Sequence, residues 1–338
     1  MLRQFLLISI LITCAASVCA QTPADQDDVI RTDTDVTNLP FTVTDAQRRF
    51  ITTLRQEDLR VLEDGVQQEV FTFQRETDRP LSIAFLVDIS ISQKYTLSDE
   101  KGAARGFIEK AIRSNKDQLA IIPFTGLAFL ELGMTHNILS AYRVLQQIEV
   151  AEPFYTGSGH PLTGIPTGPG MLGTPEEGTT AIWDAVALAS TQVLAKTQDQ
   201  RRRAIILLTD GLDTSSRLKR SEAIERVIGA EAIVYVIGIG DSKGEGVNKG
   251  VLRELAERTG GRAFFPKKDT ELETAFTEIE QELRTQYLLA YSSSNKRRDG
   301  AYRRITVEIT NPDLKKDKLS VRHRPGYYAK REVGTVTR

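Results

Sequence analysis

The chain has 338 residues, and its 44 lysines and arginines nearly balance its 45 aspartates and glutamates, giving a formal net charge of −1. This balance argues against a general nucleic-acid binder and against a strongly polybasic protein of membrane surfaces. The length is sufficient for one large domain and a smaller partner, so a hydrophobic core alone can stabilise the fold.

The first twenty residues have the pattern of a secretory signal peptide. Arg3 is followed by an apolar run over residues 5–12, and small residues at 18–20 provide a cleavage pattern. The run is too short for a membrane-spanning helix. We expect residues 1–20 to be removed and the protein to be exported, to the periplasm or the exterior, without an integral membrane segment; a retained N-terminal anchor is the alternative. Both cysteines lie in this segment, so the mature chain would have no disulfide.

Residues 21–79 are predicted to form an N-terminal β segment. Strand-like runs at 59–63 and 66–73 flank Asp64-Gly65, and Asp-Gly between two such runs is a strong hairpin signal. The sequence therefore predicts a β-hairpin ahead of the main domain.

Residues 80–284 alternate buried strands with amphipathic helices. Apolar strands separated by helices of this length indicate a doubly wound, mostly parallel α/β sheet that helices cover on both faces. One further strand, at 129–134, follows a short turn and is expected to be an antiparallel edge strand. The predicted parallel strands are 81–88, 118–124, 204–209, 232–239 and 262–265, and the predicted helices are 97–113, 137–148, 181–195, 221–229, 251–259 and 269–283.

Three more β runs follow the last helix, at 287–292, 302–310 and 318–324, and turn-forming residues separate them. Because the ends of a parallel α/β domain often lie close together, we expect this C-terminal β segment, residues 285–331, to pack with the N-terminal one in a small β module. Two separate small sheets are the alternative. Residues 332–338 are expected to be a tail.

One long segment, residues 151–178, is rich in glycine and proline. This composition excludes a helix or a central strand. We expect a long surface loop, which is either a partner-contacting loop or a mobile insertion.

Oxygen-bearing side chains alternate at the end of the first strand of the main domain. Asp88, Ser90 and Ser92 would bring one carboxylate and two hydroxyls close together, and Mg²⁺, Mn²⁺ and Ca²⁺ prefer oxygen ligands. Residues at i, i+2 and i+4 share a face of any strand, so this run alone favours a polar strand end or a helix cap.

Two more oxygen ligands are predicted at the same edge of the sheet. Thr180 precedes a predicted helix, where its hydroxyl either caps the helix or binds a metal, and Asp210 follows a buried strand, ahead of Gly211. The carboxyl ends of parallel strands meet at one edge, which is where open α/β sheets bind their ligands. Together the residues predict a divalent metal site made of Asp88, Ser90, Ser92, Thr180 and Asp210.

These residues resemble the metal-ion-dependent adhesion site of von Willebrand factor type A domains, which also occur as the inserted domains of integrins. Residues 88–92 are similar to the family's Asp-x-Ser-x-Ser motif, and Thr180 and the run 209–211 resemble its second and third elements. The resemblance covers residues 80–284, and the whole chain is similar to exported bacterial proteins of this kind that are common in acidobacteria. The family often has glycine where this chain has Ile91, a larger side chain that would restrict the loop.

The resemblance implies a protein-binding module and no enzymatic activity. Neutral hydroxyl ligands leave much of the cation's charge uncompensated, so a carboxylate from an Asp or Glu side chain of a partner protein can complete the coordination. The implied cofactor is Mg²⁺, with Mn²⁺ or Ca²⁺ as alternatives. In the family, ligand affinity can couple to movement of the last helix, here residues 269–283.

Other classes of function fit the sequence less well. A phosphoryl-transfer hydrolase could use Asp88 as its nucleophile, but the acid expected two residues later is Ser90. A dinucleotide fingerprint starting at Gly238 lacks its third glycine, because that position is Lys243. Serine hydrolysis lacks a suitably placed histidine. A metal-free structural or scaffold protein of the cell envelope is the main alternative.

Overall fold

The computed structural model describes residues 35–331 apart from 77–78, 152–178, 199 and 241–245. The predicted signal peptide, nearly all of the Gly/Pro-rich segment and the tail therefore lie outside the described residues. No helix in the described part of the chain combines the length and the apolar character needed to cross a membrane.

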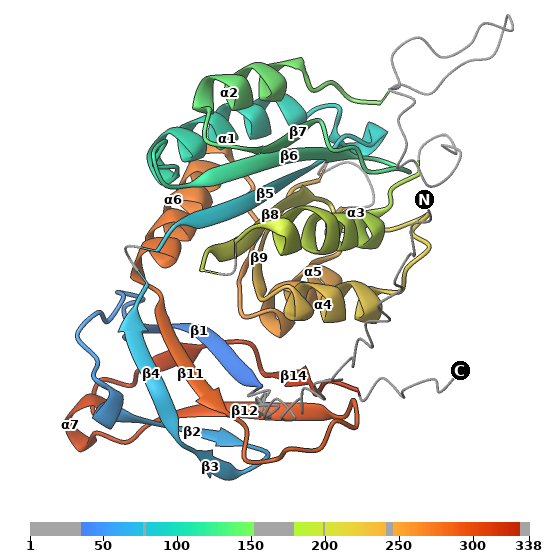
Figure 1. Cartoon of the computed structure of the whole chain (residues 1–338). Helices are drawn as coiled ribbons and strands as arrows, with labels where there is room; N and C mark the ends of the chain where they lie inside the picture. Colours follow the sequence, from blue (N-terminus) through green and yellow to red (C-terminus); the bar gives the residue numbers. More distant parts are fainter. Residues whose placement is uncertain (1–34, 77–78, 152–178, 199, 241–245, 332–338) are drawn as a thin grey trace, which may run out of the picture. The chain divides into compact units, whose positions relative to one another are not determined.

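A six-stranded, mostly parallel sheet forms the centre of the fold (Figure 1). Its strands, in the order in which they lie side by side, are β10 (Ala263–Phe264), β9 (Ala232–Gly238), β8 (Arg202–Thr209), β5 (Leu81–Asp88), β6 (Gln118–Phe124) and β7 (Leu132–Thr135). Neighbouring strands are parallel except at the edge, where β7 runs antiparallel to β6. The predicted α/β class and its antiparallel edge strand are therefore confirmed.

Helices cover both faces of this sheet (Figure 1). The helices on one face are α1 (Leu97–Ala111), α2 (Ile138–Gln147) and α6 (Asp269–Thr285), and those on the other are α3 (Ile182–Leu188), α4 (Arg220–Gly229) and α5 (Lys249–Arg258). Each face has its own apolar core, because successive side chains of a strand point to opposite faces.

The strand β5 shows why a strand between two helical layers is apolar at every position. All of its residues are buried. Phe85 packs on the α1 and α6 face, with its ring centroid 6.3 Å from that of Phe107 and 6.1 Å from that of Phe276, whereas Leu86 belongs to the core of the opposite face. A strand between two helical layers is apolar on both sides, so its sequence is a continuous apolar run.

The predicted helix 181–195 is shorter in the structure. After α3 the chain continues as a π-helical segment, Ala189–Val193, and a 3₁₀ turn, Leu194–Lys196. The hydroxyls of Ser190 and Thr191 both donate to the carbonyl of Ala187, at 3.0 and 2.7 Å. Such hydroxyls compete with the backbone for its acceptors and disturb a regular helix.

The flanking segments form two four-stranded antiparallel sheets around one apolar core, here called the β module. One sheet contains, in order, β13 (Ser320–Arg322), β1 (Val36–Thr44), β11 (Tyr287–Ser292) and β4 (Val70–Arg75). The other contains β14 (Gly326–Tyr328), β12 (Tyr302–Ile309), β2 (Leu59–Glu63) and β3 (Val66–Gln68). Each sheet combines strands from before and after the α/β domain. The prediction that the N-terminal and C-terminal β segments pack together in one β module is therefore confirmed.

The predicted hairpin joins β2 and β3. Asp64 and Gly65 have φ values of 48° and 83°, and a type I′ turn needs positive φ at both positions. The predicted strand 66–73 is divided in two, because β3 pairs with β2 whereas β4 pairs with β11 in the other sheet.

A buried carboxyl group connects the two sheets of the β module. Glu63 accepts hydrogen bonds from the hydroxyls of Tyr291 at 2.8 Å, Tyr327 at 3.0 Å and Ser293. Tyr291 belongs to β11 and Tyr327 to β14, so the donors come from both sheets. Because a buried carboxyl group needs hydrogen-bond partners, this network fixes one sheet against the other.

Replacing Phe85 tests the core between the sheet and helices α1 and α6. Phe85→Ala removes a fully buried ring and its contacts with two others, so we expect the free energy of unfolding to fall by about 3–5 kcal/mol. Urea denaturation followed by circular dichroism measures the change. Phe71 is 56% exposed, and Phe71→Ala should change stability by less than about 0.5 kcal/mol. Equal losses in the two variants would contradict the assignment of this core.

Candidate metal centre

The predicted site residues gather at the carboxyl edge of the six-stranded sheet. β5 ends at Asp88, and the parallel strand beside it, β8, ends at Thr209, directly before Asp210. After β5 the chain enters a 3₁₀ turn, Ile91–Gln93, which carries Ser92. Two adjacent parallel strands thus bring side chains that are far apart in the sequence to one place.

Asp88 is the centre of a hydrogen-bonded group. Its side chain is fully buried, and its Oδ1 accepts from the backbone N–H of Ser90 at 2.9 Å and from the hydroxyl of Ser90 at 2.6 Å. Its Oδ2 accepts from the hydroxyl of Thr209 at 2.6 Å. The hydroxyls of Ser90 and Ser92 lie 2.9 Å apart. The structure therefore brings three of the five predicted residues together.

Thr209 is part of this group but not of the predicted set. Its signal in the sequence is a hydroxyl at the last position of an otherwise apolar strand, next to Asp210. Whether that hydroxyl reaches Asp88 depends on the register of β8 against β5, in which Val87 lies opposite Leu208. A sequence alone does not give that register.

Asp210 lies next to the group around Asp88. It is buried, and its Oδ1 accepts from the backbone N–H of Leu212 at 2.9 Å. Gly211 adopts a φ of +83°, and a Cβ there would come within 2.8 Å of the Leu252 side chain. The turn that holds Asp210 at the sheet edge therefore requires glycine.

Thr180 is held near these loops by its backbone. Its N–H donates to the hydroxyl of Thr214 at 2.8 Å, and its carbonyl accepts from the N–H groups of Thr214 and Ser215 at 2.9 and 3.1 Å. Asp213 accepts the N–H of Ile182 at 2.7 Å at the start of α3, so Asp213 performs the capping considered for Thr180. Within the described residues, no hydrogen bond joins the Thr180 hydroxyl to the other four predicted residues.

The electrostatics of Asp88 favour a cation beside it. Burial raises the pKa of Asp88 to about 6, and the negative charge of Asp210 adds to this increase, whereas the hydrogen bonds from Ser90 and Thr209 oppose it. A carboxyl group with a raised pKa is one whose negative charge is incompletely compensated. A divalent cation next to Asp88 would supply the missing compensation.

Glu100 is a third acidic side chain near this edge. It is 1% exposed, and neither of its carboxyl oxygens has a hydrogen-bond partner in the described part of the chain. Burial raises its pKa to about 8, and the negative charges of Asp88 and Asp210 contribute to the increase. Its helical spacing relative to the buried residues Ala104, Phe107, Ile108 and Ala111 is the signal that places it on the buried face of α1.

A cavity of about 600 Å³ adjoins the group. Gly240 lines this cavity, and a Cβ there would lie 3.2 Å from the Cβ of Asp210, so the cavity borders the site. Tyr95 also lines it and is 75% exposed. Ile91, in the turn that carries Ser92, is 41% exposed. Exposed apolar side chains thus lie next to a buried group of oxygens, as at interaction surfaces.

The donor set fits a hard divalent cation. Among the described residues, no group of three or more His, Cys, Asp or Glu side chains could hold a metal ion. A metal here would therefore depend on hydroxyls as well as carboxylates, and such an all-oxygen set suits Mg²⁺, Mn²⁺ or Ca²⁺. The assignment of the ligands stays a prediction for Asp88, Ser90, Ser92, Thr180 and Asp210.

A comparison with protein families identifies the domain. Residues 171–280 match the model of the von Willebrand factor type A domain. Residues 171–280 thus belong to a von Willebrand factor type A domain. The resemblance seen in the sequence is therefore confirmed. The match to the von Willebrand factor type A model includes Thr180 and Asp210 and begins after Asp88.

Several solved structures are similar to this chain. BatB from Bacteroides thetaiotaomicron shares 21% identity, over 60% of this chain and 98% of its own, with a TM-score of 0.45. A von Willebrand factor type A protein from Catenulispora acidiphila shares 12% identity, over 90% and 76%, with a TM-score of 0.48. Proximal thread matrix protein 1 from the mussel byssus, in a form with a zinc-occupied adhesion-site motif, shares 16% identity, over 65% and 50%, with a TM-score of 0.48. This chain thus spans half the length of the mussel protein. A search of curated proteins finds no match.

The raised pKa of Glu100 predicts how the stability of the metal-free von Willebrand factor type A domain depends on pH. The folded protein keeps a proton on Glu100 that the unfolded chain releases near pH 4.5, so this group lowers stability progressively as the pH rises from about 4.5 to 8. Glu100→Gln removes this loss. Relative to the unmodified protein, the variant should gain up to about 4 kcal/mol between pH 5 and pH 8.

Urea denaturation in the presence of EDTA at pH 5, 6.5 and 8 measures this difference. Glu109, an exposed glutamate on the same helix, provides the matched control, and Glu109→Gln should show no pH-dependent gain. A constant difference between Glu100→Gln and the unmodified protein across this range would contradict the assignment of Glu100 as a protonated buried acid.

Proposed function

We propose that this protein is an exported protein-binding module whose von Willebrand factor type A domain holds a divalent cation, with Mg²⁺ as the proposed ion. The observation that carries the proposal is the hydroxyl-rich group around the buried Asp88 at the carboxyl edge of the sheet. Ser90, Ser92 and Thr180 would supply hydroxyl oxygens, and Asp88 and Asp210 would supply carboxylates.

The composition of this donor set favours binding over catalysis. Three neutral hydroxyls and two carboxylates, which are themselves engaged in hydrogen bonds, leave a bound divalent cation able to attract a further negative group. A carboxylate of an Asp or Glu side chain on a partner protein provides such a group. The side chains themselves hold the site in place, because Ser90 and Thr209 orient the two oxygens of Asp88.

The surroundings of the site support a protein as the partner. Ile91 and Tyr95 are exposed next to it, and exposed aromatic and aliphatic side chains commonly provide binding energy at protein interfaces. A partner segment that places its carboxylate at the cation would bring its neighbouring residues against these two side chains.

A metal-free scaffold of the cell envelope is the second candidate function. It is favoured by one observation: both oxygens of Asp88 already have hydrogen-bond donors from the protein. In this case the group around Asp88 would only stabilise the sheet edge. Export itself is proposed from the signal-peptide pattern of residues 1–20.

Metal binding should stabilise the purified protein. At a Mg²⁺ or Mn²⁺ concentration a hundred times the dissociation constant, the free energy of unfolding should increase by about 2.7 kcal/mol. Asp88→Asn keeps the shape of the side chain but removes its charge, so the increase should disappear. Asp313 is an exposed aspartate in the β module, and Asp313→Asn should respond to metal as the unmodified protein does. Identical unfolding curves with metal and with EDTA for the unmodified protein would favour the metal-free scaffold.

Partner capture should depend on the metal. Immobilised protein should retain a partner from an envelope extract of the source cells in Mg²⁺, and EDTA should release it, because the proposed contact is a carboxylate on the cation. Asp88→Asn should retain nothing in Mg²⁺. Mass spectrometry of the eluted proteins measures the difference. Retention of the same proteins by Asp88→Asn and in EDTA would show that binding does not use this site.

A further inference from the structure

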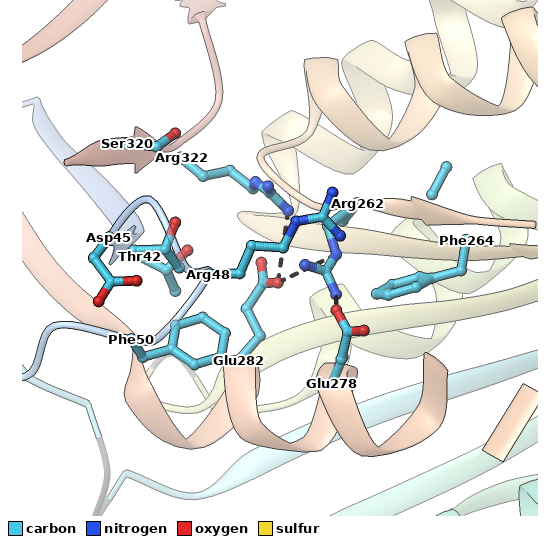
Figure 2. A pocket seen from close by; sticks show the side chains of 12 residues that line it. Thr42, Asp45, Arg48, Phe50, Arg262, Phe264, Glu278, Glu282, Ser320 and Arg322 are labelled. Carbon is cyan, nitrogen blue, oxygen red and sulfur yellow. Dashed lines mark hydrogen bonds and ion pairs between the residues drawn. The ribbon is translucent and has the colours of Figure 1, made fainter. Parts of the chain in front are cut away.

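A second cavity, of about 410 Å³, lies between the von Willebrand factor type A domain and the β module (Figure 2). The domain contributes residues after α5 and on α6 to its wall, and the β module contributes residues of β1, of the turn that follows β1, and of β13. The cavity is distinct from the candidate metal centre, because the two share no residue.

Three arginines from separate parts of the sequence line this cavity. Arg262 comes from the von Willebrand factor type A domain, and Arg48 and Arg322 come from opposite ends of the β module. Figure 2 shows their side chains extending toward one another around Glu282, a buried residue of α6. Guanidinium groups repel one another, so their convergence in one cavity requires negative charge to compensate it.

The backbone directs Arg48 into this arrangement. It has a φ of 63°, which is uncommon for a residue other than glycine. The turn that contains it is closed by Asp45, whose Oδ1 accepts from the backbone N–H groups of Gln47 and Arg49, both at 2.9 Å. The Arg48 side chain makes no ion pair with any other described residue.

The carboxylates that face the arginines do not fully compensate them. Asp45 is paired with Arg49, at 2.7 Å, which does not line the cavity. Glu278 is paired with Arg262. Glu282 alone lies between Arg262 and Arg322, and burial raises its pKa even though both guanidinium groups oppose the increase. Three arginines and three carboxylates line the cavity. Because Asp45 is neutralised by Arg49, only Glu278 and Glu282 remain to compensate the three arginines, and burial disfavours the charged form of Glu282.

Two N–H groups at the cavity have no acceptor. The Nε of Arg262 lies 3.9 Å from Glu282 Oε2, and the Nη1 of Arg322 lies 3.7 Å from the same oxygen. Both distances exceed those of a hydrogen bond. Both nitrogens are buried and have no hydrogen-bond partner among the described residues. Buried N–H groups of charged side chains are costly to leave without an acceptor, so the positive charges of Arg262 and Arg322 are incompletely compensated by the protein.

The rest of the wall suits a small molecule with an anionic group. The hydroxyls of Thr42, Thr44 and Ser320 add donors, and the rings of Phe50 and Phe264 add apolar surface. The guanidinium carbon of Arg262 lies 4.1 Å from the centre of the Phe264 ring, which orients that arginine by a cation–π contact.

We propose that this cavity binds a small molecule through a phosphate or carboxylate group that contacts Arg48, Arg262 and Arg322. Guanidinium groups bind both kinds of oxyanion through paired N–H donors. Binding here is independent of the candidate metal centre, since neither Asp88 nor any other predicted metal ligand lines the cavity.

Isothermal titration calorimetry of the full-length protein tests this proposal. Inorganic phosphate and citrate are titrated separately into protein that has been freed of metal and then dialysed free of chelator, because a polycarboxylate chelator would compete for the cavity. Ionic strength is kept constant with sodium chloride, so that general charge screening does not differ between the samples. We expect saturable binding at one site for at least one of the two probes, and the probe that binds more tightly identifies phosphate or carboxylate as the preferred group. Asp88→Asn should bind the same probe unchanged.

The variants Arg48→Gln and Arg322→Gln should each weaken binding at least tenfold. Arg48 is exposed, so Arg48→Gln should leave the fold intact. This variant therefore tests the proposal even if Arg322→Gln does not fold. Arg60, an arginine of β2 paired with Glu308 and absent from the cavity wall, provides the control Arg60→Gln, which should bind as the unmodified protein does. Absence of saturable binding of both probes to the folded protein, or unchanged affinity in Arg48→Gln, would overturn the proposal.

Discussion

The carboxyl group of Asp88, buried at the end of a buried strand, constrains the carboxyl edge of the sheet. Because a buried carboxylate needs donors, Ser90 must turn back toward Asp88 directly after β5, and Thr209 must reach it from β8. These two contacts fix the path of the chain after both strands. The same contacts align several oxygens within a small space, so one group meets the local folding requirements and also supplies the oxygens that the proposed cation would need.

Acidic side chains gather around this group in greater number than the hydrogen bonds of the protein satisfy. The negative charge of Asp210 contributes to the raised pKa of Asp88. The same crowding of acidic groups contributes to the raised pKa of Glu100, which stays protonated and has no hydrogen-bond partner among the described residues. In the second cavity the proposed imbalance has the opposite sign, since one of its three carboxylates, Asp45, is already paired with Arg49 and the other two face three arginines. The two proposed sites therefore differ in the sign of the ligand that they would attract, a cation in one case and an anion in the other.

How far the sequence predicts this molecule depends on how local each signal is. β5 is predictable because its apolar run and the Asp88 that ends it are contiguous. The hairpin at Asp64 and Gly65 is predictable because its turn chemistry is local. Thr209 and Glu100 are harder, since one depends on strand register and the other is a charged residue on a buried helix face, contrary to its usual preference. The cavity at Arg48, Arg262 and Arg322 depends on contacts between distant segments, which no local pattern records.

The pairing of β1 with β11 joins segments that are far apart in the sequence, which constrains when the β module can form. Val36 lies opposite Ser292, so the first strand of the β module is synthesised long before its partner. Until β11 follows α6 out of the ribosome, β1 and β4 lack the strand between them and are open to association with other chains. The α/β domain between them can form from more local contacts in the meantime. A short interval between completion of that domain and arrival of the last strands would thus protect the chain from aggregation.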